Sequence, residues 1–140
     1  QLAESACELC LKLNNHYEPA LFNLAKVYQR QEKWAESTQQ FKAFLEVAGP
    51  RPSAYTQMGF NLNRQSDWDN AKHFLEKSIS LQPEDINTRI TLAETFTNLA
   101  QIKKAHEHLT TALKMHPNPN QIEAINNMML SLTSLKTTTP

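Results

Sequence analysis

The chain repeats its apolar pattern every 34 residues, and this period constrains the fold more than any other feature. Large apolar residues recur at that step in several columns, and small residues recur in two others. The columns are Tyr28, Leu62 and Phe96; Leu24, Met58 and Leu92; Ala25, Gly59 and Ala93; Trp34, Trp68 and Ile102; Ser37, Ala71 and Ala105; Phe41, Leu75 and Leu109; and Leu45, Ile79 and Leu113. Because such a period indicates stacked supersecondary units, the columns predict three like units in tandem.

Each unit predicts a pair of helices. Its apolar positions fall at helical spacing in two runs, separated by the short turns "RQEK", "RQSD" and "NLAQ". Gly49, Pro83 and Pro117 close the units with helix breakers. Small residues such as Gly59 and Ala71 are expected where the two helices meet, since overpacking there costs about 1–3 kcal/mol. Helix formers dominate and glycine occurs only twice, which indicates an all-α chain.

A helix–turn–helix unit of this length resembles the tetratricopeptide repeat family, whose signature is Trp-x-x-Leu-Gly-x-x-Tyr, then Ala-x-x-x-Phe, then Pro. The middle unit matches closely, with "YTQMGFNL", then "AKHFL", then Pro83. Arg89 departs from the usual aromatic residue in the third unit. The resemblance covers about residues 18–118. It implies an α-solenoid of helical hairpins wound into a right-handed superhelix.

The two ends differ from the repeats. Residues 1–17 fit only the second helix of a unit, so we expect the native protein to continue upstream with the missing first helix. After the third unit the columns no longer hold, and a C-terminal capping helix is expected. The predicted order is a truncated leading repeat at 1–17, repeat units at 18–51, 52–85 and 86–118, a capping helix at 119–136 and a tail at 137–140.

Composition argues against several classes of function. The 14 basic and 14 acidic residues balance, and no basic stripe indicates a nucleic-acid partner. No apolar run is long enough to cross a bilayer, so no membrane partner is expected. Two glycines cannot build a phosphate-binding loop, and HExxH and GxSxG are both missing. We therefore predict a chain that is not an enzyme, with no catalytic residues, no cofactor and no metal.

The cysteines and histidines are the best candidates for a reactive or metal-binding site. Cys7 and Cys10 have the spacing of a redox dithiol, but they fall mid-helix in packing columns, and a zinc site needs about four ligands. Packing is therefore the preferred interpretation of the pair. On a helix, His106 and His108 point about 200° apart and cannot hold one ion. We expect His73, His106 and His108 on outward faces.

The concave groove is the candidate binding site. The resemblance implies that the first helices line it, and the columns that face inward change character from unit to unit. A face that packs against nothing would be free for a partner. We predict that a protein or peptide contacts seven residues there: Phe22, Asn23, Lys26, Gln57, Phe60, Arg64 and Ile90. The three apolar residues are expected to meet only solvent or a partner, and the amides and cations to bind peptide backbone and acidic residues.

One subgroup of the family binds the acidic C-terminal tails of chaperones through a clamp of Lys, Asn, Asn, Lys and Arg. The matching positions here are Phe22, Lys26, Gln57, Asn87 and Thr91. None carries the expected residue, so the sequence argues against chaperone-tail binding through these units.

The sequence thus favours a non-enzymatic interaction or scaffold module that binds a peptide or a partner helix. Two alternatives stay open. In the first, the chain is a regulatory or positioning arm of a larger enzyme whose catalytic domain is absent from this chain. In the second, it self-associates as a homo-oligomer through the exposed leading helix. No signal peptide or lipidation motif is visible in a chain that begins at Gln1, so the compartment is unassigned, with the cytoplasm favoured.

Overall fold

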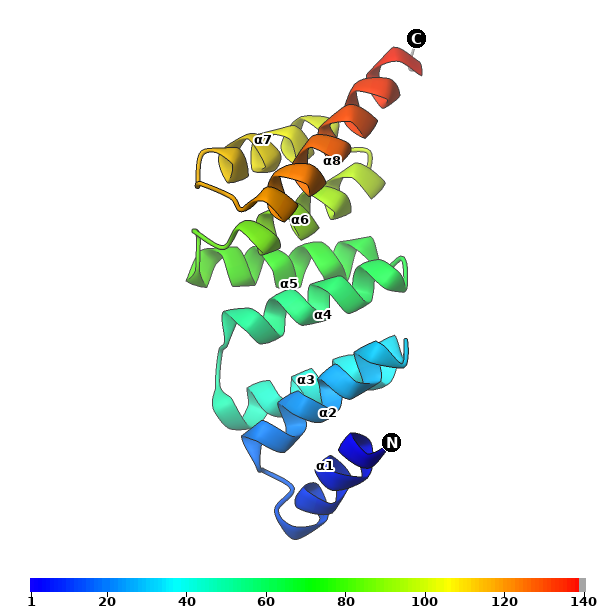
Figure 1. The fold of residues 1–140 in the computed structure, drawn as a ribbon, viewed down its shortest axis with the longest axis vertical. Helices are drawn as coiled ribbons and strands as arrows, with labels where there is room; N and C mark the ends of the chain where they lie inside the picture. The colour runs from blue at the N-terminus through cyan, green and yellow to red at the C-terminus, as the bar shows by residue number, and fades with distance from the viewer. Residues whose placement is uncertain (139–140) are drawn as a thin grey trace.

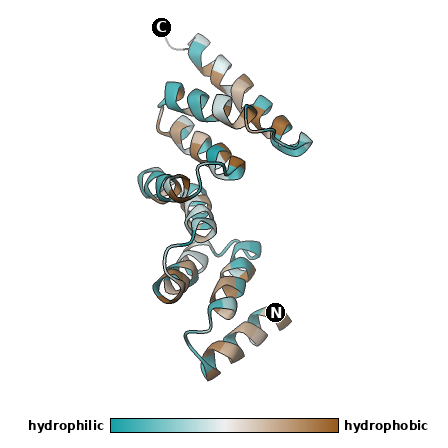
Figure 2. Ribbon diagram, turned by 90° about the vertical axis from the view of Figure 1, so that its left-hand side faces the viewer, coloured by the Kyte–Doolittle hydropathy of each residue, from teal (hydrophilic) through white to brown (hydrophobic). Residues whose placement is uncertain are grey.

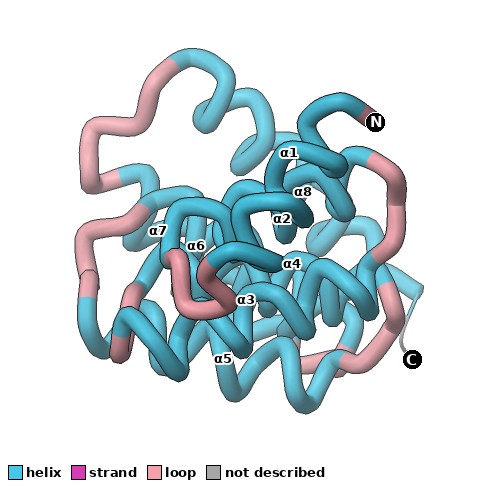
Figure 3. The backbone as a smooth tube through the Cα atoms, turned by 90° about the horizontal axis from the view of Figure 1, so that it is seen from below, coloured by secondary structure: helices cyan, strands magenta, loops and turns pink. Residues whose placement is uncertain are grey.

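The computed structural model describes residues 1–138, and within them it confirms the predicted all-α solenoid. Eight helices follow one another along the long axis, joined by short loops with no strand between them (Figures 1 and 3). They are α1 (Leu2–Leu13), α2 (Glu18–Arg30), α3 (Trp34–Ala48), α4 (Pro52–Arg64), α5 (Trp68–Leu81), α6 (Ile86–Asn98), α7 (Ile102–Leu113) and α8 (Pro119–Thr138). None of these helices is long and apolar enough to cross a membrane.

The helices stack as antiparallel hairpins. Helices α2 and α3, α4 and α5, and α6 and α7 pair with each other, and α3 and α5 also pack on the first helix of the next hairpin. Helix α1 packs on α2 at one end, and α8 packs on α6 and α7 at the other, so the two termini lie at opposite ends (Figure 1). Apolar residues lie along the helices, and the connecting loops are mostly hydrophilic (Figure 2).

Each hairpin turns in the same way. Glu32, Ser66 and Ala100 lie 34 residues apart and all adopt left-handed backbone, with φ of 58°, 58° and 57°. The next amide in each turn reaches back five residues, as Gln101 N does to Phe96 O at 2.8 Å. This is the Schellman arrangement that satisfies the last carbonyls of a helix. The acceptors in the three turns are Tyr28, Leu62 and Phe96, which form the first column of the repeat.

Small residues allow the close helix contacts that the sequence predicted. Ala25, Ala71, Ala93 and Ala105 are all fully buried. A Cβ added at Gly59 would run into the Leu75 side chain, which is itself fully buried. The core forms two clusters, one around α2 to α4 and one from α5 to α8.

Helix α8 extends further than the sequence suggested. We expected a helix over 119–136 and a tail over 137–140, but the helix continues to Thr138. The Thr137 hydroxyl donates to the Ser134 carbonyl at 2.8 Å, and adding residues to a formed helix costs little. Residues 139–140 of the expected tail lie outside the described residues.

Candidate functional site

Side chains from successive first helices meet on one side of the solenoid. Lys26 of α2 reaches Gln57 of α4 at 3.2 Å, and Arg64 of α4 lies 3.9 Å from Glu94 of α6. At the end of the array, Gln121 of α8 reaches Asn87 of α6 at 2.9 Å. The surface carried by α2, α4, α6 and α8 is here called the first-helix face, and each of its helices is joined to the next by a side-chain contact.

Lys26 and Gln57 belong to a polar network that runs inward from this face. The Gln57 Oε1 atom accepts from Lys26 Nζ and from Gln29 Nε2, the latter at 3.0 Å. Gln29 Nε2 also donates to the fully buried Asn61 at 2.7 Å. Because its oxygen is engaged internally, Gln57 can offer a ligand its amide nitrogen as a donor, whereas the sequence suggested both donor and acceptor. Burial, aided by the charge of Arg30, lowers the pKa of Lys26.

The three apolar candidates are not free anchors. Phe22 is half-buried, with its ring edge-on to Phe41 at 5.3 Å between centroids. Phe60 is half-buried and edge-on to Trp34 at 5.9 Å. Ile90 packs against the core cluster of the C-terminal helices. The expectation that these side chains meet only solvent or a partner is wrong, because large apolar groups from neighbouring helices cover part of each. Their contact with a ligand stays a prediction.

Asn23 and Arg64 are the exposed members of the predicted set. The Arg64 guanidinium lies 4.9 Å from the centre of the Phe60 ring and 3.9 Å from a Glu94 carboxylate oxygen. An exposed pair of this kind is worth only about 0–1 kcal/mol, so Arg64 can exchange Glu94 for an acidic ligand group at little cost.

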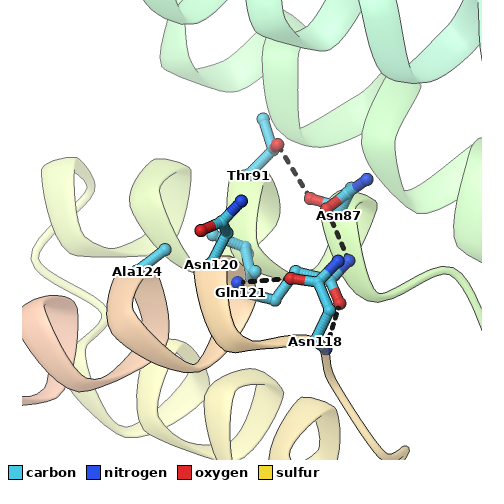
Figure 4. Close-up of a pocket in the computed structure, with 7 residues that line it drawn as sticks. Asn87, Thr91, Asn118, Asn120, Gln121 and Ala124 are labelled. Carbon is cyan, nitrogen blue, oxygen red and sulfur yellow. Dashed lines mark hydrogen bonds between the residues drawn. The ribbon is translucent and has the colours of Figure 1, made fainter.

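A hollow of about 410 Å³ lies between α6 and the start of α8 (Figure 4). We call it the α6–α8 hollow, and its lining residues are Asn87, Ile90, Thr91, Asn118, Asn120, Gln121 and Ala124. The binding set predicted from sequence contains only Ile90 of these seven, because residues 119–136 were interpreted as a cap outside the groove. The missed signal is the repeat step itself, since Gln121 follows Asn87, and Ala124 follows Ile90, by 34 residues.

Local sequence explains why α8 begins where it does. The Asn118 side chain accepts from the Gln121 backbone amide, and the Gln121 side chain accepts from the Asn118 backbone amide, both at 2.9 Å. Pro119 occupies the first helical position, where its missing N–H costs nothing. This reciprocal cap resembles the Ser-x-x-Glu capping box with amides in both roles, and it fixes two side chains of the hollow.

The thiols occupy partly exposed sites. Helix α1 has no buried residue; Cys7 is half-buried and Cys10 is exposed. The expectation that both fill packing positions is therefore wrong for Cys10. Burial, and then the neighbouring Cys10, raises the pKa of the Cys7 thiol, which disfavours the reactive thiolate.

The histidines are partly as expected. His73 and His106 are exposed, but His108 stacks on Phe96, with ring centroids 5.4 Å apart, and lies 3.3 Å from Arg89 Nη1. The outward position predicted for His108 is wrong because that side of α7 packs on α6. Within residues 1–138, no three His, Cys, Asp or Glu side chains gather around a common point that could hold a metal ion.

Comparison with protein families and curated proteins gives one consistent result. A family model described as "Tetratricopeptide repeat" matches residues 62–125. Anaphase-promoting complex subunit 6 of Dictyostelium discoideum is 28% identical over 76 residues, which is 54% of this chain and 9% of that protein. The peroxisomal targeting signal receptor of Candida glabrata is 28% identical over 94 residues, or 67% of this chain and 16% of the receptor. The chain thus spans a small part of the curated relatives it matches.

Solved structures share the fold at low sequence identity. MamA superimposes with a TM-score of 0.81 at 17% identity, covering 91% of this chain and 75% of MamA. YrrB, described as a TPR protein with an unusual peptide-binding site, gives a TM-score of 0.75 at 15% identity, covering 91% and 66%. The Yersinia enterocolitica chaperone SycD, solved with a peptide of the translocator YopD, gives 0.74 at 17% identity, covering 83% and 92%.

Proposed function

Since this chain belongs to the tetratricopeptide repeat family, we propose that it is a non-enzymatic protein-interaction module that binds an extended peptide on its first-helix face. The observation that carries the proposal is that polar side-chain contacts link α2 to α4, α4 to α6 and α6 to α8, while Arg64 stays exposed beside them. SycD, bound to a peptide, and YrrB, described by its peptide-binding site, support the same mode of use.

The proposed peptide carries an acidic residue near its centre. Lys26, Arg30 and Arg64 supply cations on α2 and α4, and the amide of Gln57, which lies beside Lys26, supplies a donor for a peptide carbonyl. A preformed groove favours this mode because only the ligand has to become ordered on binding.

A binding experiment tests the proposal. Peptides selected from a random-sequence display library would be titrated calorimetrically against the wild type and against the double variant Lys26→Met, Arg64→Met, which removes both charges. We expect affinity to fall at least tenfold, or about 1.4 kcal/mol. Lys42→Met, an exposed charge on the second helix α3, is the matched control and should bind like the wild type. Equal affinity of the double variant, or failure to select any peptide, would contradict the proposal.

Self-association is a second candidate, favoured by the exposed apolar residues of α1. Leu9 is 59% exposed and Leu13 is 83% exposed, on a helix with no buried residue. Sedimentation velocity over a wide concentration range should show a dimer that Leu9→Glu abolishes and Leu130→Glu, on the opposite end, leaves intact. A monomer at every concentration would eliminate this candidate.

A role as the positioning arm of a larger enzyme rests on one relative. Protein O-mannosyl-transferase Tmtc3 of Drosophila melanogaster is 23% identical over 97 residues, which is 69% of this chain and 10% of that protein. The arm would use the same first-helix face, so the charge-removing double variant also tests it when assayed in the full-length protein.

A further inference from the structure

We propose that the α6–α8 hollow binds a neutral amide unit, namely a main-chain peptide group of the ligand, in preference to a carboxylate. The inference deepens the proposed function and rests on it, because it assigns one subsite of the first-helix face and the chemistry that this subsite selects.

Hydrogen bonding within the hollow engages three amide oxygens once each and leaves most of the amide N–H groups without a protein partner. Asn87 Oδ1 accepts from Gln121 Nε2, Asn118 Oδ1 accepts from the Gln121 backbone amide, and Gln121 Oε1 accepts from the Asn118 backbone amide, each at 2.9 Å (Figure 4). An amide nitrogen carries two hydrogens. The Asn87 and Asn118 nitrogens therefore keep both N–H groups for a ligand, and the Gln121 nitrogen keeps one. The hydrogen bonds therefore hold these three side chains in place, with N–H groups that can donate to a carbonyl oxygen of the ligand.

Asn120 and Thr91 supply the complementary acceptors. Asn120 is exposed and makes no hydrogen bond with the other lining residues drawn in Figure 4, so its oxygen and nitrogen can pair with a ligand. The Thr91 hydroxyl donates to the Asn87 backbone carbonyl at 2.9 Å, which leaves its lone pairs free to accept. A peptide group presents one carbonyl oxygen and one N–H, and the hollow offers partners for both.

The lack of charged residues in the lining favours a neutral peptide group over a carboxylate. None of the seven lining residues is ionisable. A carboxylate finds no cation here and, because it only accepts hydrogen bonds, leaves the acceptor atoms of Asn120 and Thr91 without a partner, whereas a neutral amide matches both the donors and the acceptors of the hollow. The aliphatic side chains of Ile90 and Ala124 provide an apolar wall for the residue beside that amide. The volume of about 410 Å³ lies within the range of about 300–1,000 Å³ usual for small-ligand sites.

A second hollow continues the same seam and favours an extended ligand over a small isolated one. It measures about 170 Å³ and lies further along α6 and α8. Its lining residues are Glu94, Thr97, Asn98, Met128 and Ser131. A peptide chain anchored by its backbone in the α6–α8 hollow can run along the seam toward Met128, which offers an adaptable apolar contact.

Two small probes test the assignment directly. 4-Methylpentanamide and 4-methylpentanoate have the same carbon skeleton, but the first carries a single neutral amide and the second a single carboxylate. Each would be titrated into the isotope-labelled protein while the side-chain NH₂ signals of Asn87, Asn118 and Gln121 are followed by NMR. We expect the amide probe to shift these signals and to bind at least fivefold more tightly than the acid.

Isosteric variants identify the groups responsible. Asn87→Asp and Asn118→Asp keep the oxygens that hold Gln121 and remove the NH₂ donors, and aspartate is also a good helix cap. We expect each to weaken the amide probe about tenfold while the thermal unfolding midpoint stays near that of the wild type. Asn126→Asp, an exposed residue on α8 outside the hollow, introduces the same charge and should change nothing.

Three results would overturn the inference: no shift of the NH₂ signals, tighter or equal binding of the acid, or full binding by both aspartate variants. These outcomes are independent of the peptide-selection experiment. Peptides that bind through Lys26 and Arg64 without any probe binding at the hollow would refute the subsite alone. Probe binding at the hollow, in a protein for which no peptide can be selected, would refute the wider function alone.

Discussion

At the scale of the residue, Gly59 marks a close contact between α4 and α5. A Cβ there would meet Leu75 Cγ and lie 2.6 Å from Leu75 Cδ2, and Leu75 has no room to move because it is fully buried. The equivalent positions in the neighbouring units are Ala25 and Ala93, so the α4–α5 pair is the hairpin in which even a methyl group does not fit without a shift.

We predict that Gly59→Ala lowers the free energy of unfolding by about 1–2 kcal/mol. The overpacking cost of about 1–3 kcal/mol exceeds the gain of about 0.5–1 kcal/mol from replacing a helical glycine. Urea denaturation measures the change. Leu75→Ala removes the obstructing atoms, so the double variant should lose less than the sum of the two single losses. Strict additivity would show that the contact is not the cause.

His108 gives the molecule a pH dependence. Burial first, and then the charge of Arg89, lowers the pKa of His108 from its ordinary 6.5, and Glu107 and Glu76 oppose the shift only in part. The unfolded chain therefore binds a proton in a range of pH where the folded chain does not. Linkage requires the free energy of unfolding to be at its full value above the ordinary pKa and to fall as the pH decreases through the pKa of the folded state.

We predict that His108→Gln flattens this decline between about pH 7.5 and about pH 5.5, where histidine is the main side chain that titrates. Chemical denaturation at a series of pH values provides the measurement. His106→Gln, an exposed neighbour on α7, should leave the slope unchanged. If His108→Gln and the wild type have the same slope, the decline has another origin.

At the scale of the element, the hairpin turns carry a local cost. Glu32, Ser66 and Ala100 occupy left-handed backbone positions that glycine adopts more easily, and a residue with a Cβ loses about 1–2 kcal/mol there. The hydrogen bonds from Lys33, Asp67 and Gln101 close these turns nonetheless. The helix pairs packed on either side therefore override the preference of the turn residues.

We predict that Ala100→Gly raises the free energy of unfolding by about 0.5–1 kcal/mol, since the relief of the left-handed strain exceeds the added entropy of the unfolded chain. Thermal or urea unfolding would detect the gain. Ala6→Gly, an exposed alanine inside α1, should lose about the same amount. A loss at Ala100→Gly would mean that the turn is not strained.

At the scale of the whole molecule, each helix contacts only the next one or two helices along the chain, so stability varies along the array. Helix α1 has no buried residue and packs on α2, whereas Met58 of α4 and Leu75 of α5 are fully buried. Helix α8 lies between these extremes, with Ile125 and Leu132 buried.

We predict that backbone amides of α1 exchange hydrogen fastest among the helices, that those of α4 and α5 exchange slowest, and that α8 is intermediate. Hydrogen exchange followed by mass spectrometry resolves the three regions. Uniform protection from α1 to α5 would show that the array unfolds as a single cooperative unit.

The sequence by itself determined the period, the helix pairs and the small residues where helices cross, because these depend on spacing along one chain. Only the tertiary structure decided which side chains meet between units. Phe22 and Phe60 contact aromatic side chains of α3. The Gln57 side-chain oxygen accepts hydrogen bonds from Lys26 and Gln29. Such contacts depend on how each helix is rotated about its axis, and a shift of one residue turns a helix by about 100°.

Helix α8 shows the same limit most clearly. The repeat step places Asn126 below Leu92, yet Ile125 is the buried residue, so α8 is rotated relative to the first helices before it. From spacing alone the helix therefore looked like a cap outside the pattern. In three dimensions it lies beside α6 and brings Asn118 and Gln121 to Asn87. The repeat step aligns Gln121 with Asn87, but only the packing of α8 on α6 brings their side chains into hydrogen-bonding contact and forms the amide-lined hollow.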